Sequence, residues 1–139
     1  MGARILAIDH GTVRMGIAIS DELKLIAQPL RFIPAHPFDQ FLAQLEQLLR
    51  EQEVELILIG MPRNMDGTYG PAASKVQAFI ATLQKTVAVP IKTWDERLTS
   101  VQANRMLRET NVRGRKQRER VDQTAAAILL QSYLDSLRA

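Results

Sequence analysis

The stretch that decides the fold reads Arg4-Ile-Leu-Ala-Ile-Asp9-His-Gly-Thr-Val-Arg14-Met-Gly-Ile-Ala-Ile-Ser-Asp21. Its first apolar run, residues 5–8, predicts a strand buried on both faces. A second run, residues 15–19, follows so soon that it predicts an antiparallel hairpin, because a parallel return needs a dozen or more residues. Asp9 should therefore lie at the inner end of a central strand, where an uncompensated carboxylate is costly. A divalent cation shared with further acids would compensate it.

Outward from this hairpin, the spacing of apolar residues predicts alternating strands and helices. Pro29 indicates that the third strand lies at a sheet edge, and Pro71 suits the first turn of a helix. The predicted fold is a mixed five-stranded α/β sheet, a three-stranded antiparallel meander joined to two parallel strands and flanked by helices. The further predicted strands span residues 25–33, 54–60 and 89–94, and the predicted helices span 38–51, 71–83, 99–109 and 121–137.

Length and composition indicate an ordinary globular domain. The 139 residues are expected to form one domain that buries roughly 68–70% of the surface of the unfolded chain. The absence of cysteine excludes disulfides, thiolate zinc sites and cysteine nucleophiles. We find no signal peptide and no apolar run long enough to span a membrane, so we expect a cytoplasmic protein.

Positive charge is concentrated in one segment. The formal net charge is +3, yet residues 113–120, Arg-Gly-Arg-Lys-Gln-Arg-Glu-Arg, carry five bases and one acid. This segment alone contributes +4, which leaves the rest of the chain slightly negative. We interpret it as a loop that binds an anion.

Three acids follow or precede predicted elements at one edge of the sheet: Asp9, Glu96 and Asp122. Each has an ordinary structural explanation, respectively a turn, a surface ion pair and a helix-dipole contact. Together they favour Mg²⁺ or Mn²⁺, because hard cations prefer oxygen ligands. Two such ions can activate water and stabilise a leaving oxygen in phosphodiester hydrolysis. Acids for metal beside bases for phosphate indicate a nuclease.

Four motifs stand in order along the chain. They are Asp9 to Asp21, Gly60-Met-Pro-Arg-Asn-Met-Asp-Gly67, Asp95-Glu-Arg-Leu-Thr-Ser100 and Asp122-Gln-Thr-Ala-Ala-Ala-Ile-Leu-Leu-Gln-Ser-Tyr-Leu134. Together they resemble the YqgF family of small bacterial proteins, described as nucleases of pre-16S rRNA and, earlier, as Holliday junction resolvases. The resemblance implies a ribonuclease H-like fold with Asp9, Glu96 and Asp122 as catalytic and metal-binding triad. It also implies a role in maturing the 5′ end of 16S rRNA precursors, with branched DNA as the alternative substrate.

Glu96 fits this triad less well than the other two acids. The strand expected beside strand one ends at Gly60 without an acid, so Glu96 would reach from about two strand spacings away, ~9.6 Å. Such a distance favours metal binding that water or substrate completes. Asp66 and Asp95 are the alternative second ligands.

The substrate is expected beyond the carboxyl ends of the strands, where open α/β sheets bind ligands. There Arg63 would contact a phosphate and Asn64 a sugar or base, although a solvated turn set by Asp66 and Gly67 explains them equally well. His10 and His36 have no third ligand at metal spacing and are interpreted as incidental. The other expected substrate-binding residues are Arg14, Arg113, Arg115, Lys116 and Arg118.

Two other classes of function compete with the nuclease. The Asp-x-Gly-Thr opening is similar to the phosphate loop of actin-like and sugar-kinase ATPases, but those need two lobes and this chain supplies one. A nucleic-acid-binding module without catalysis, with structural acids, remains an alternative. RNA or branched DNA is the expected partner, and the chain is expected to be a monomer or a weak homodimer.

Overall fold

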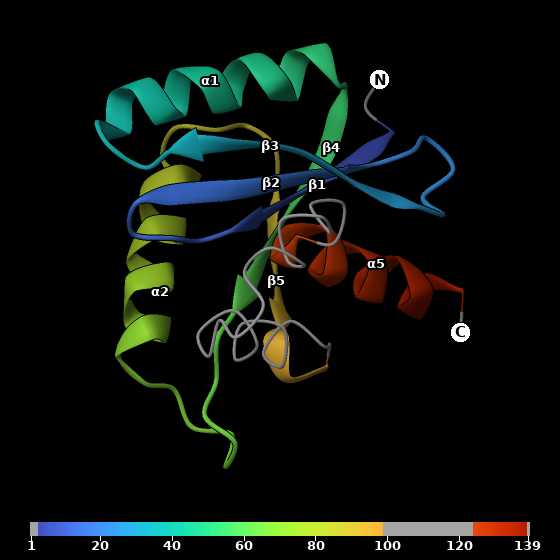
Figure 1. Cartoon of the computed structure of the whole chain (residues 1–139). Coiled ribbons are helices and arrows are strands. Elements are labelled where there is room, and N and C mark those ends of the chain that lie inside the picture. The colour runs from blue at the N-terminus through green and yellow to red at the C-terminus, as the bar shows by residue number, and fades with distance from the viewer. Residues whose placement is uncertain (1–2, 99–123, 139) are drawn as a thin grey trace, which may run out of the picture.

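The computed structural model describes residues 3–98 and 124–138. These residues form a five-stranded sheet in the order β3-β2-β1-β4-β5 (Figure 1). β1 is central, antiparallel to β2 and parallel to β4, and β5 is parallel to β4. The predicted meander and parallel pair are thus confirmed. The strands are β1 (Arg4–Asp9), β2 (Arg14–Ser20), β3 (Ala27–Pro34), β4 (Val54–Met61) and β5 (Ile91–Asp95).

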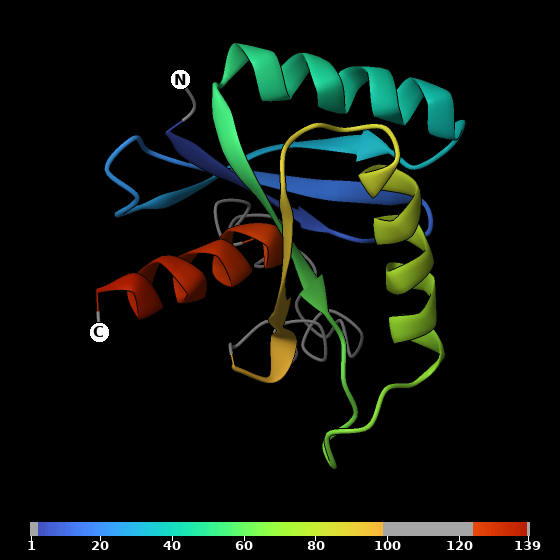
Figure 2. The same cartoon turned by 180° about the vertical axis from the view of Figure 1, so that it is seen from behind.

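Helices cover both faces of this sheet, as the two opposite views show (Figures 1 and 2). α1 (Phe38–Glu51) and α2 (Pro71–Gln84) pack on one face, and α5 (Ala125–Leu137) packs on the other. Pro71 is in the first turn of α2, as predicted. Among these described helices, none is long and apolar enough to cross a bilayer.

Alternation along β1 decides which face each side chain joins. Leu6 and Ile8 belong to the core beneath α1 and α2, whereas Ile5 and Ala7 belong to the core beneath α5. Because strand side chains alternate with a period of two, Asp9 continues the α5 face. The carboxylate therefore lies where the hydrophobic core under α5 ends.

Several boundaries differ from those predicted. β3 begins at Ala27 rather than at residue 25, and β3, β4 and α2 each end one residue later. β5 begins at Ile91 rather than at residue 89, because Pro90 lacks an amide hydrogen and can only accept, here from the Ile57 amide at 2.9 Å. A 3₁₀ turn, η1 (Glu96–Leu98), follows β5. α5 begins at Ala125, not near residue 121, because the Thr124 side chain accepts a hydrogen bond from the Ala127 amide and caps the helix. The predicted helix 99–109 lies outside the described residues.

Candidate active site

Asp9 ends β1, and Glu96 begins the 3₁₀ turn that follows β5 at the same edge of the sheet. The β1–β4 register pairs Ile8 with Ile59, so Asp9 falls level with Gly60. The β4–β5 register pairs Gly60 with Trp94, and Glu96 follows two residues later. Trp94 packs in the core beneath α5, as does Leu58, two residues before Gly60. Asp9, Gly60 and the chain leading to Glu96 therefore meet at the same edge on the α5 side.

Gly60 provides the space through which Glu96 approaches β1. A Cβ built on Gly60 would lie 3.1 Å from the Glu96 Oε1, 3.2 Å from its Cγ and 3.1 Å from the Leu129 Cδ2. The Glu96 side chain thus lies over the backbone of β4, the strand that separates β5 from β1. Glu96 therefore comes closer to Asp9 than the two strand spacings that the sequence predicted between them. Gly60 was missed as a site residue, although an isolated glycine in an apolar strand often marks such a close approach.

The environment of Glu96 disfavours its charge. Its residue is only 6% exposed. Burial, and secondarily the negative charge of Asp95, raise the pKa of the Glu96 carboxyl from 4.5 to about 7. Both causes disfavour the ionised form of Glu96, whereas a neighbouring cation would favour it and lower the pKa again. A strongly perturbed acid at the carboxyl ends of strands is typical of a functional site.

The third acid of the predicted triad, Asp122, lies outside the described residues. Within residues 3–98 and 124–138, no group of three His, Asp or Glu side chains could hold a metal ion. The described part of the site therefore supplies two candidate ligands, Asp9 and Glu96. The predicted substrate contacts Arg113, Arg115, Lys116 and Arg118 also fall outside it.

Arg14 packs on Phe32, which approaches the same glycine, Gly16, as Asp9 does. Asp9 pairs with Gly16 across β1 and β2, and Gly16 pairs with Phe32 of β3. The exposed guanidinium of Arg14 lies over the Phe32 ring, with Cζ 4.0 Å from the ring centroid. A cation held on an aromatic ring next to the first acid is well placed for a polyanionic substrate.

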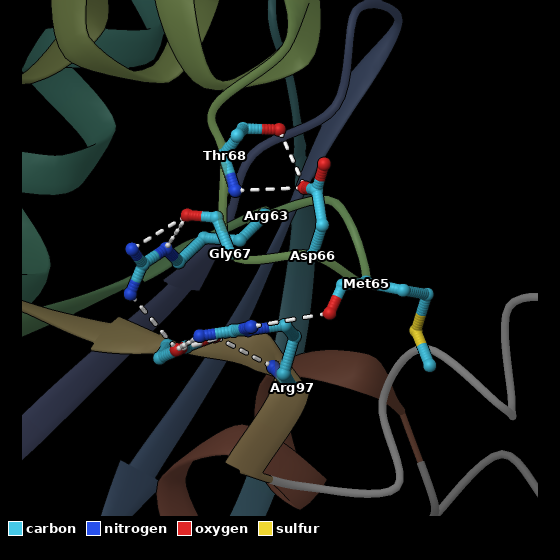
Figure 3. A network of polar contacts seen from close by, with 7 residues as sticks. Arg63, Met65, Asp66, Gly67, Thr68 and Arg97 are labelled. Atoms are coloured by element: carbon cyan, nitrogen blue, oxygen red, sulfur yellow. Dashed lines mark hydrogen bonds and ion pairs between the residues drawn. The ribbon is translucent and has the colours of Figure 1, made fainter.

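Arg63 is bound within the protein, as Figure 3 shows. Its Nη2 donates to the Gly67 carbonyl at 2.6 Å and its Nη1 pairs with the Asp95 Oδ2 at 3.3 Å. Arg97 contacts the same Asp95 oxygen at 3.0 Å. These contacts, led by the Arg97 hydrogen bond, lower the pKa of Asp95. Asp95 therefore ties the loop after β4 to the end of β5.

Asp66, which Figure 3 shows, and Asn64 stabilise the turn of that loop. The Asn64 amide donates to the Thr68 hydroxyl at 2.9 Å. The Asp66 Oδ1 accepts from the Thr68 hydroxyl at 2.6 Å and from its backbone amide at 3.0 Å, which lowers the pKa of Asp66. The contacts of Arg63 and Asn64 thus correspond to the turn that the sequence offered as the alternative explanation.

A cleft of about 220 Å³ opens at the same edge on the α2 side. It was not foreseen, because its lining comes from short segments far apart in the chain. The His10 ring lies 5.0 Å from that of Phe79, and burial, with the charge of Lys75, lowers the pKa of His10. The cleft is lined by His10, Thr12, Gly60, Pro62, Pro71, Ala72, Lys75, Val76 and Glu96.

Comparison with known proteins agrees with this arrangement. Residues 3–136 match the family described as "RuvX: Holliday junction resolvase". A protein of Chloroflexus aggregans named "Putative pre-16S rRNA nuclease" is 45% identical over 134 residues, covering 96% of this chain and 94% of that protein. One of Halothermothrix orenii with the same name is 44% identical over 132 residues, covering 95% and 94%.

Solved structures with the same fold are far more distant in sequence. RuvC of Thermus thermophilus, solved with a Holliday junction substrate, superposes with a TM-score of 0.56 at 14% identity, covering 97% of this chain and 95% of RuvC. The fowlpox virus resolvase, solved with Holliday junction DNA, gives 0.50 at 12% identity, covering 98% and 99%. This likeness confirms the ribonuclease H-like fold.

Proposed function

Because this chain belongs to the RuvX family, the YqgF-type nucleases that its motifs predicted, we propose that it matures the 5′ end of 16S rRNA precursors by hydrolysing a phosphodiester bond. The names of relatives that share more than 40% of its residues support this substrate. The observation that carries the chemistry is the position of Glu96, buried over Gly60 at the level of Asp9.

The donor set fits a divalent metal. Asp9 and Glu96 offer carboxylate oxygens, the ligands that Mg²⁺ and Mn²⁺ prefer. Glu96 is buried beside the charge of Asp95, and this costly environment is one that a bound cation would relieve. Asp122, which follows from the family motif, would be the third ligand. When bound, the metal would activate water and stabilise the leaving oxygen.

The remaining residues would bind and orient the substrate. Arg14, held on Phe32, would contact a phosphate of the strand that reaches Asp9. The basic segment 113–120 would hold the polyanion close to the acids, since it leads directly into Asp122. The Arg63–Asp95–Arg97 contacts would keep the loop after β4 in place beside Glu96.

A second candidate is resolution of Holliday junctions. The family description and the junction complexes of the two structural neighbours favour it, and the same acids would serve. The decisive experiment compares cleavage of a 16S rRNA precursor and of a four-way DNA junction, with Mg²⁺ and with Mn²⁺, against an Asp9→Asn control. Cleavage of the precursor at its 5′ end supports the first function, and cleavage of the junction alone supports the second. If the protein binds but cuts neither, it is a non-catalytic binding module.

A further inference from the structure

We propose that the cleft between β4 and α2 is a binding site for a second phosphate of the substrate strand, next to the phosphate that is cleaved. Lys75 is the residue that binds this second phosphate. This inference rests on the nuclease function proposed above. It assigns a role to Lys75 and the start of α2, which the proposed nuclease function does not use.

The cleft is continuous with the candidate active site. Glu96 and Gly60 line it, and so does His10, which follows Asp9 directly. A strand whose reacting phosphate lies at Asp9 and Glu96 can therefore place its neighbouring phosphate at this opening. A volume of about 220 Å³ holds a phosphodiester group together with water, since one water molecule takes up roughly 30 Å³.

The charges around the cleft leave Lys75 available for an anion. In residues 3–98 and 124–138, no acid lies within ion-pair distance of Lys75, and the first turn of α2 carries no acid. Glu96 is the acid of the lining, and the proposed metal would offset its charge. A flexible ammonium group of this kind binds phosphate as a point charge.

Two uncharged donors complete the site. Thr12, which carries a hydroxyl group, lines the cleft, and so does Ala72 in the first turn of α2. Pro71 has no amide hydrogen, and the amides of Ala73 and Ser74 both donate to the Gly70 carbonyl. The Ala72 amide is therefore the first-turn donor left for a ligand among the described residues. The positive end of the helix dipole adds to the preference for an anion.

A binding experiment tests Lys75 against a matched lysine on the same helix. The probe is a labelled single-stranded RNA covering the 5′ end of the 16S rRNA precursor, measured by fluorescence anisotropy over a range of salt with Ca²⁺ in place of the catalytic metal. Lys75→Gln should raise Kd about tenfold and reduce the slope of log affinity against log salt by about 0.7. Lys85→Gln, at the other end of α2, should change neither, and Lys75→Arg should retain most of the affinity. If Lys75→Gln behaves as Lys85→Gln does, the proposal is wrong.

A second experiment locates the contact on the substrate. Once the cleavage site is mapped, single phosphates on either side of it are replaced by neutral methylphosphonates. At one position, the replacement should weaken RNA binding by the wild type but should not weaken binding by Lys75→Gln any further. This is the result that a double-mutant cycle gives for two groups in contact. If every replacement weakens binding by Lys75→Gln as much as it weakens binding by the wild type, Lys75 contacts none of these phosphates and the proposal fails.

The two proposals fail in different ways. If wild type binds RNA but cuts neither substrate with either metal, the nuclease function fails, and with it the assignment of the site to a phosphate beside a scissile bond. If wild type cuts and Lys75→Gln keeps the wild-type KM and salt slope, only the subsite fails. Loss of kcat with unchanged KM would also contradict a binding role for Lys75.

Discussion

The Glu96 side chain lies against Gly60, so that a single missing side chain on β4 lets the acid that follows β5 approach the strand of Asp9. The clearance is small, because a Cβ on Gly60 would lie 3.1 Å from the Glu96 Oε1. Position 60 requires glycine because Glu96 and Leu129 approach the backbone closely there, and not because of an unusual backbone conformation. The position of Glu96 should therefore depend on residue 60.

Gly60→Ala should reduce cleavage at least tenfold while the fold persists. The added methyl group would press on Glu96 and Leu129, and overpacking of this kind costs about 1–3 kcal/mol of stability. Cleavage rate and urea unfolding measure the two effects. As a control, Gly60→Ala is added to Glu96→Gln. If it reduces the residual activity of that variant by a further tenfold, then Gly60 does not act through Glu96.

Asp9→Asn should abolish metal-dependent cleavage with little change in stability. The amide has nearly the same shape as the carboxyl and removes a charge from the inner end of a central strand. Calorimetry with Mn²⁺ should show that binding is lost, while the melting temperature without metal is unchanged or higher. An unfolded Asp9→Asn protein would mean that the carboxylate is structural. Full activity would remove Asp9 from the site.

Glu96→Gln should change how stability depends on pH. The folded-state pKa of about 7 lies above the ordinary 4.5, so the folded protein holds a proton that the unfolded chain releases between these values. Relative to Glu96→Gln, the metal-free wild type should lose stability as pH rises from about 4.5 to 7, by up to ~3 kcal/mol. Glu96→Gln should lack this decline and be the more stable protein above pH 7.

Chemical unfolding in EDTA at several pH values measures this difference. Glu46→Gln, on the partly exposed surface of α1, serves as the matched control and should keep the wild-type decline. Added Mg²⁺ or Mn²⁺ should stabilise wild type above pH 7 and have less effect on Glu96→Gln. If wild type and Glu96→Gln show the same change in stability between pH 5 and 7 without metal, then Glu96 is not strained by its environment.

Much of the fold follows from local sequence, whereas the site depends on contacts between residues that lie far apart in the sequence. The strand ended by Asp9 and the edge position of Pro29 follow from apolar spacing and from the chemistry of proline. The reach of Glu96 was unpredictable because it depends on the absence of a side chain at Gly60, 36 positions away. Arg63 was ambiguous for the same reason, since its partner Asp95 lies 32 residues further along.

Arg115, Lys116 and Arg118, all outside the described residues, should together account for much of the salt dependence of binding. Each phosphate contact contributes about 0.7 to the slope for single strands, so their replacement by Gln should flatten it by roughly 2. Affinity should fall similarly for different sequences, because phosphates carry no sequence information. Replacing Arg31, Arg50 and Lys85, exposed bases elsewhere, removes the same charge as a control. Equal effects of the two triple variants would show that the segment contributes only net charge.

Asp95→Asn should destabilise the loop after β4 and leave metal binding intact. Arg63 and Arg97 approach the same Asp95 oxygen at 3.3 and 3.0 Å, and the amide would leave two neighbouring guanidinium groups without a counter-charge. The Asp95 side chain is 17% exposed, so we expect a loss of about 1–3 kcal/mol at pH 7. Because these contacts lower the pKa of Asp95, its contribution should disappear as pH falls below the ordinary value of 3.8.

Unfolding measurements and hydrogen exchange at residues 62–70 follow the loss of the loop contacts in Asp95→Asn. Adding Arg63→Gln should recover part of the stability, because it removes one of the two positive charges that repel each other. Mn²⁺ binding distinguishes this structural role from the alternative that the sequence left open. If Asp95→Asn abolishes Mn²⁺ binding without loss of stability, while Glu96→Gln retains it, then Asp95 is the second metal ligand and Glu96 is not.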